Sequence, residues 1–76
     1  MSPALPVVSG AETLRALSRA GFVQVSQRGS HVKLRDANGL VVIVPMHDEL
    51  APGTLRSILR QATIGVEDFI NHLRQK

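Results

Sequence analysis

Three side chains suited to cutting a phosphodiester occupy alternate positions of one segment: His31, Lys33 and Arg35. Alternate residues of a strand share a face, so this spacing would place an imidazole and two permanent cations side by side. Histidine transfers protons near neutral pH. Fixed cations stabilise the negative charge that builds on phosphate oxygens as an RNA backbone is cut. The segment therefore indicates RNA cleavage with His31 as the candidate catalytic residue, although a lone exposed histidine beside a turn fits the same pattern.

A hairpin is expected to present these residues. Residues 22–28 alternate like a strand with Val23 and Val25 on one side, and Gly29-Ser30 reads as a two-residue turn in which glycine supplies a positive φ. The register that this turn predicts pairs Arg28 with His31, Ser26 with Lys33, Val25 with Leu34, and Gln24 with Arg35. Val32 and Leu34 would then face the core, leaving the candidate site on the opposite face.

A third strand is expected over residues 40–44, where both faces are apolar and Pro45 ends the run. Asn38-Gly39 indicates a tight turn before it. The facing that a two-residue turn predicts puts Val41 and Ile43 inward, and Val42 and Val44 outward beside Arg35 and Lys33. A three-residue turn would reverse this facing. Outward valines would mark a surface that a protein partner covers together with His31.

Helix signals complete the expected fold. Ser9 and Glu12 form a capping box that starts a helix ending at Gly21, Pro52 begins an amphipathic helix over residues 52–62, and Gly65 opens a short last helix. The predicted class is α+β: a three-stranded antiparallel sheet with helices on one face, in the order α-β-β-β-α-α. Residues 1–8 are expected to be a flexible leader, and residues 9–76 a single domain.

Length, charge and residue composition limit the kinds of partner and cofactor that we expect. A chain of 76 residues forms one domain, and its formal net charge of +3 favours a polyanionic partner. Phe22 and Phe69 are its only aromatic residues, so RNA binding would depend on charge and shape rather than on base stacking. Cysteine is absent and no His pair has ligand spacing, so we expect no metal and no cofactor. No apolar run approaches the ~20 residues of a membrane span, so a cytoplasmic protein is expected.

Other residues have two interpretations each. His47 is either a second acid or base, or a brace for the loop after the third strand, and we favour the brace because nothing places it near His31. His72 is expected on the surface. Arg56 and Arg60 either grip phosphates near the helix start or lie on a solvated helix face. The expected RNA contacts are Arg28, Ser30, Lys33, Arg35, Arg56 and Arg60, with Gly29 positioning the turn.

Several short motifs in order resemble the HicA family of mRNA interferase toxins. They are Gly29-Ser30-His31 after Gly21-Phe22, Pro45-Met46-His47, the segment 53–62, and Glu67-Asp68-Phe69, so that the likeness spans about residues 11–73. The resemblance implies a fold like that of double-stranded-RNA-binding domains and an essential strand histidine, which is His31 here. The chain departs from the family at Val32, where another histidine or a polar residue is frequent.

The resemblance further implies the toxin of a toxin–antitoxin pair: an endoribonuclease that cleaves mRNA without metal, by attack of the 2′-OH, and that a HicB-type antitoxin neutralises. Any link to DNA would be indirect, through the antitoxin complex. Two other interpretations remain open. One is a non-catalytic RNA-binding module of the double-stranded-RNA-binding type, which would tolerate loss of His31. The other is a protein-binding member with no salt-dependent affinity for RNA.

Overall fold

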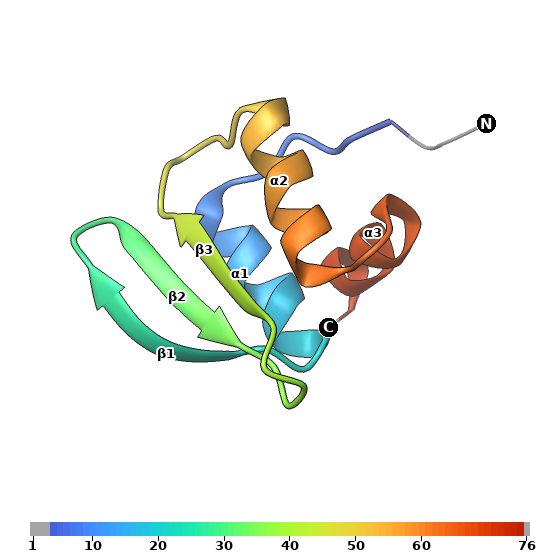
Figure 1. Ribbon diagram of the computed structural model, residues 1–76. Helices are drawn as coiled ribbons and strands as arrows, with labels where there is room; N and C mark the ends of the chain where they lie inside the picture. The colour runs from blue at the N-terminus through green and yellow to red at the C-terminus, as the bar shows by residue number, and fades with distance from the viewer. Residues whose placement is uncertain (1–3, 76) are drawn as a thin grey trace.

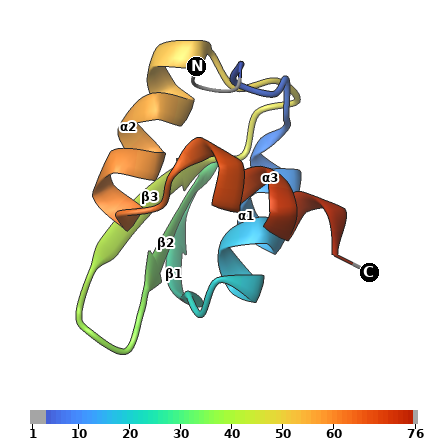
Figure 2. The same cartoon turned by 90° about the vertical axis from the view of Figure 1, so that its right-hand side faces the viewer.

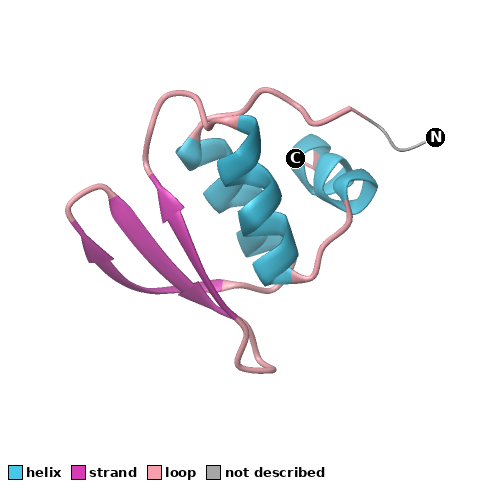
Figure 3. Cartoon of the chain, turned by 45° about the horizontal axis from the view of Figure 1, so that its top comes forward, coloured by secondary structure: helices cyan, strands magenta, loops and turns pink. Residues whose placement is uncertain are grey.

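The structure, a computed structural model, describes residues 4–75. Its elements are α1 (Gly10–Arg19), β1 (Val23–Arg28), β2 (His31–Arg35), β3 (Val41–Pro45), α2 (Pro52–Ala62) and α3 (Val66–Arg74). The strands form one antiparallel sheet in the order β1-β2-β3, and the helices lie on one side of it (Figures 1 and 3). The predicted α+β class and element order are confirmed.

The core lies between the sheet and the helices. Val32, Leu34, Val42 and Val44 of the sheet are buried against it. The helices contribute the buried side chains of Ala16, Leu17, Leu55, Ile58, Leu59, Ala62 and Phe69. In Figure 2, α3 packs beside α1 while α2 runs along β3. Because every helix covers the same side, the other face of the sheet stays open.

The start of α1 has the predicted capping box. The backbone N–H of Glu12 donates to Ser9 Oγ at 3.0 Å, and the N–H of Ser9 donates to Glu12 Oε1 at 2.9 Å. The hydrogen bond from the Ser9 backbone lowers the pKa of the Glu12 carboxyl, and the Ser9 side chain adds to this effect. Both interactions favour the charged form of the carboxyl. Thr13 lies on the buried side of this helix with Ala16 and Leu17, and its hydroxyl donates to the Ser9 carbonyl at 2.9 Å.

The register of β1 departs from the prediction at its first half. Arg28 pairs with His31 and Ser26 with Lys33 as expected, but a bulge between Gln24 and Ser26 shifts the rest. Gln24 lies opposite Leu34, and Val23 lies opposite Arg35, so the pairs Val25–Leu34 and Gln24–Arg35 are wrong. The physical reason is that all six residues of β1 are exposed, Val23 to 65%, so burial does not fix the register there.

The facing predicted for β3 is also wrong. Arg35 pairs with Val41 and Lys33 with Ile43, and it is Val42 and Val44 that are buried. The turn contains three residues, because the N–H of Asp36 donates to the Leu40 carbonyl at 3.0 Å. The strand includes Pro45, whose missing N–H costs nothing on an edge strand. The two valines therefore stabilise the core and are not available to a partner.

The segment before α1 packs in part onto the domain. Val8 is buried, and its carbonyl accepts a hydrogen bond from the N–H of Leu50 at 2.8 Å. Leu5 is half-buried against the same core, so the packed domain extends into the predicted leader at least as far as Leu5. Residues 1–3 of that leader lie outside the described residues. Within residues 4–75, none of the helices has both the length and the apolar character needed to cross a membrane.

Candidate functional site

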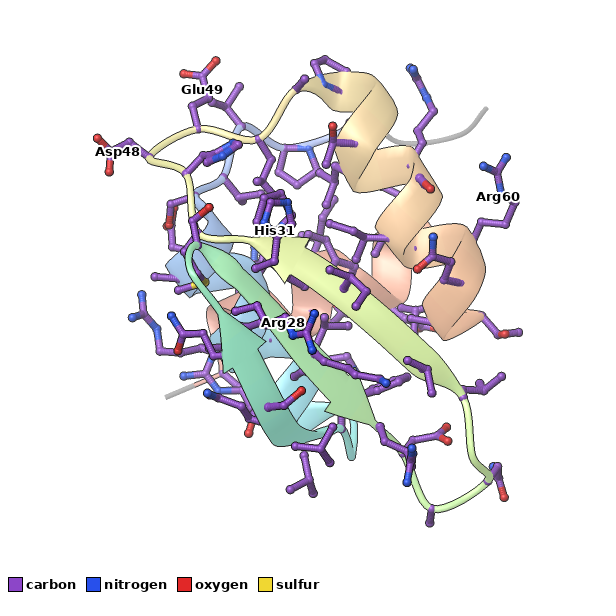
Figure 4. All side chains as sticks on the ribbon, turned by 60° about the vertical axis from the view of Figure 1, so that its left-hand side comes forward. Arg28, His31, Asp48, Glu49 and Arg60 are labelled. Atoms are coloured by element: carbon purple, nitrogen blue, oxygen red, sulfur yellow. The ribbon has the colours of Figure 1, made fainter. Side chains whose placement is uncertain are left out.

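The open face of the sheet presents three rows of side chains that run across the strands. Cross-strand pairing makes these rows Arg28–His31–Pro45, Ser26–Lys33–Ile43 and Val23–Arg35–Val41. The first and second rows are each polar at two of their three positions, and the third places an arginine between two valines. The third members of the first two rows differ, because Pro45 is buried while Ile43 is exposed. Figure 4 shows Arg28 and His31 together on this face. The row farthest from His31 is therefore the most apolar of the three.

His31 takes its place from the turn and from its neighbours along β2. Val32 and Leu34 are buried, so alternation puts His31 on the exposed face. The turn before it holds Gly29 at φ +54°, and the Gly29 carbonyl accepts from Gln27 Nε2 at 3.0 Å. Ser30 is tied to the end of β3, because its carbonyl accepts from the N–H of Met46 at 2.6 Å.

An open hollow of about 450 Å³ lies at the centre of this arrangement. Its walls are formed by Ser26, Arg28, His31, Lys33 and Ile43. It brings an imidazole and two permanent cations to one small volume that solvent and a long polymer can reach. Such a set can move a proton at the 2′-OH of RNA while it stabilises charge on the neighbouring phosphate.

Ile43 is the site residue that sequence reasoning missed. It lies opposite Lys33 and is 43% exposed, whereas the expected turn put it in the core. The signal that could have placed it is Asp36, a residue type that favours turns by accepting bonds from backbone N–H groups two to four residues on.

The other expected RNA contacts lie outside the hollow. Ser30 and Gly29 lie in the turn beside it, and Arg35 occupies the row farthest from His31. Arg56 and Arg60 are exposed on α2, and Figure 4 shows Arg60 on the outer side of that helix, away from His31. Arg60 is thus separated from Arg28 of the sheet.

The remaining histidines differ in their surroundings. The side chain of His47 is exposed and does not line the hollow, while its carbonyl accepts from the N–H of Gly10 at 2.8 Å. That bond joins the loop after β3 to α1. His72 was expected on the surface, but it is half-buried: its Nδ1 atom is buried and its carbonyl accepts from Arg19 Nη1 at 2.8 Å. The reason is that α3 packs against α1.

The two acidic side chains of the loop before α2 are set apart from His31. Asp48 and Glu49 belong to the exposed loop before α2, and in Figure 4 both project away from the sheet. Across residues 4–75, the His, Asp and Glu side chains form no cluster of three or more that could hold a metal ion. The charge at the hollow is therefore dominated by Arg28 and Lys33.

The comparison with protein families identifies the chain. The family model of the HicA toxin of bacterial toxin–antitoxin systems matches residues 10–64, well over half of the 76 residues. The chain belongs to the HicA toxin family. The HicA match includes the whole sheet, every residue of the hollow, and α2, whereas α3 with Glu67-Asp68-Phe69 lies beyond it. No curated protein matches the chain. As a HicA family member, it is a toxin of a toxin–antitoxin system.

Proposed function

We propose that this toxin is an endoribonuclease that cleaves mRNA without a metal ion, with His31 as its catalytic residue. The observation that carries the proposal is the open hollow in which His31 lies with Arg28 and Lys33. A small domain has little apolar area with which to enclose a substrate, so an open site suits a polymer. The position of the hollow within the HicA match supports the same activity.

The proposed reaction uses the substrate's own nucleophile. His31 accepts the proton of a 2′-OH as that oxygen attacks the adjacent phosphorus. The bond from phosphorus to the 5′-oxygen breaks, and this oxygen takes a proton from water. Arg28 and Lys33 stabilise the charge that develops on the non-bridging oxygens. The products are a 2′,3′-cyclic phosphate and a 5′-hydroxyl, and DNA is not cut because it lacks the 2′-OH.

Further RNA contacts would extend on both sides of the hollow. Arg35, in the row farthest from His31, is positioned for the RNA backbone on one side of the hollow, and Ser30, in the turn, is positioned for it on the other side. Arg60, on the outer side of α2, would contact only RNA that bends around the domain, and the exposed Arg56 of the same helix would add a phosphate contact. Phosphate contacts of this kind provide affinity without sequence preference.

A HicB-type antitoxin is the proposed partner of the toxin. It would neutralise the enzyme by covering the open face, which carries both the hollow and the exposed apolar residues beside it. This places the partner's contacts on the outward side of the sheet instead of on Val42 and Val44. Any contact with DNA would be made by the antitoxin.

The test is cleavage of an mRNA fragment in EDTA by the wild type and by His31→Ala. We expect the wild type to cut, and the variant to be slower by about 10²–10⁴-fold, the usual contribution of general acid–base catalysis. DNA of the same sequence should stay intact. The same change at His47 separates its two roles, since a brace leaves the chemical step intact and a second proton-transfer group does not.

The competing interpretation is an RNA-binding module without activity. It predicts that the wild type and His31→Ala bind RNA equally and that neither cuts it. A toxin that acted only through proteins would show no RNA affinity that falls as salt rises. Cleavage that stops in EDTA, or cleavage of DNA, would also contradict the proposed mechanism.

A further inference from the structure

We propose that the hollow beside His31 is a subsite for one unpaired nucleotide, whose base lies against Ile43 while its phosphate lies between Arg28 and Lys33. The proposed toxin would then require single-stranded RNA at its cutting site. This inference rests on RNA as the ligand of the proposed function, but it does not depend on the cleavage step.

The first support is the chemistry of the hollow's lining. Ser26, Arg28, His31 and Lys33 are polar or charged, and the fifth lining residue, Ile43, is apolar. Ile43 is 43% exposed, because its neighbours Val42 and Val44 point to the buried side of β3. An apolar surface is thus held directly opposite a cation, because Ile43 pairs with Lys33 across the strands.

A nucleotide with a free base matches this pairing of properties. Its phosphate is anionic and the faces of its base are apolar, so one unit can satisfy Lys33 and Ile43 together. A duplex hides the faces of its bases by stacking and would leave Ile43 in water. Phe22 and Phe69 are buried in the core, so an aliphatic side chain has to take the role that aromatic rings have in other RNA-binding proteins.

The distance along the strand places this base close to the reacting bond. His31 and Lys33 are two residues apart in β2, which corresponds to roughly 7 Å. That is about one nucleotide of an extended chain, so the base at Ile43 belongs to the nucleotide beside the phosphate that His31 faces. The volume of about 450 Å³ lies within the roughly 300–1,000 Å³ range of ligand pockets.

A binding measurement in a His31→Ala background tests the subsite while the RNA stays intact. A fluorescent single-stranded RNA and the same RNA annealed to its complement are titrated, and the anisotropy of the label is recorded. Ile43→Thr is compared with Val41→Thr, because Val41 also lies on the open side of β3 with 37% exposure but does not line the hollow. Circular dichroism confirms that both variants fold.

We expect Ile43→Thr to weaken binding of the single strand about five- to tenfold, the effect of losing one or two buried carbon atoms. Val41→Thr should leave the affinity unchanged. The duplex should bind less tightly than the single strand and should not respond to Ile43→Thr. An RNA of the same length without bases should also bind both variants equally, because it has no base to contact Ile43. A general distortion of the sheet would instead weaken binding of this RNA as well.

Equal affinities of the two threonine variants for the single strand would overturn the subsite, as would an equal loss on the duplex. An Ile43→Thr variant that loses only antitoxin binding would also overturn it, because the residue would then serve a protein interface. If the wild type fails to cut RNA while the binding differences persist, the proposed enzyme activity fails and the subsite stands.

Discussion

At the scale of single residues, the position of His31 depends on the two residues before it. Gly29 has φ +54°, a left-handed conformation that side chains with a Cβ disfavour, and this turns the chain from β1 into β2 within two residues. Ser30 then accepts a bond from Met46, which holds the turn against the end of β3. The imidazole is thereby aimed by backbone geometry, and the buried Val32 prevents the strand from rotating.

Gly29→Ala is expected to lower the free energy of unfolding by roughly 1–2 kcal/mol, the cost of a left-handed conformation for a residue with a Cβ. An added Cβ would meet no atom within 4 Å, so the loss comes from the backbone alone. RNA cleavage should fall as well, because a relaxed turn re-aims His31. Urea titration and the initial rate of cleavage measure the two effects.

Gly29→Asn is the matched control for this prediction. Asparagine tolerates the left-handed region, so it should keep more of the stability and of the cleavage rate than alanine does. Equal behaviour of the two variants would show that the conformation of Gly29 does not position His31.

At the scale of elements, the facing of β3 is decided by the turn before it. Oδ1 of Asp36 accepts from the N–H of Asn38 at 3.0 Å and from that of Leu40 at 2.8 Å. Gly39, at φ +87°, completes a loop of three residues. One residue more or fewer in this loop would turn every β3 side chain to the other face. Asp36 therefore stabilises the loop length that puts Ile43 on the open face, a facing that the burial of Val42 and Val44 also favours.

Asp36→Ala is expected to destabilise the protein by roughly 1–3 kcal/mol, because it removes two backbone bonds to a charged acceptor. Cleavage by the folded protein should change little, since this turn joins the ends of β2 and β3 that are far from His31. Asp48→Ala, which removes a carboxylate from the exposed loop before α2, is the control for lost charge. Thermal unfolding of the wild type, Asp36→Ala and Asp48→Ala measures the loss. Equal stability of the two variants would contradict the proposed stabilisation of the turn by Asp36.

The pairing beside the Gly29-Ser30 turn could be predicted from the sequence because two independent signals agree there. The Gly29-Ser30 turn and the burial of Val32 both predict the same pairing near the turn, so Ser26, Arg28, His31 and Lys33 were placed together correctly. The facing of β3 and the register of the first half of β1 could not be predicted, because one of these signals is missing there. In β3 both faces are apolar, so hydrophobic alternation cannot select between Val42 and Ile43, and in β1 nothing is buried.

At the scale of the whole molecule, the start of α1 and the segment before it are hydrogen-bonded to the loop that follows β3, at the end of the sheet that carries the candidate site. The N–H of Gly10 donates to the carbonyl of His47, and Val8 binds the N–H of Leu50. These bonds hold the loop after β3 against the start of α1. The backbone of Gly10 and the backbone of the loop must approach closely for the bonds to form. The same end of β3 provides Pro45, the cross-strand partner of His31. Packing on the covered side of the sheet thus fixes the geometry of the open side.

Gly10→Ala tests this coupling between the two sides of the sheet. A Cβ at residue 10 would collide with the carbonyl oxygen of Pro45 and lie 2.8 Å from the Cα of Met46. Both are backbone atoms, so no side chain can move aside, and α1 has to shift away from β3. We expect a loss of about 1–3 kcal/mol in unfolding free energy, as for other overpacked cores.

Gly53→Ala is the control, because residue 53 occupies the same first turn of a helix with nothing within 4 Å of an added Cβ. It should raise the unfolding free energy by about 0.4–1 kcal/mol, since alanine restricts the unfolded chain. The cleavage rate should fall in Gly10→Ala alone, because displacement of Pro45 moves the strand position opposite His31. If Gly10→Ala lost stability but kept the full rate, the open face would be independent of the helices that pack behind it.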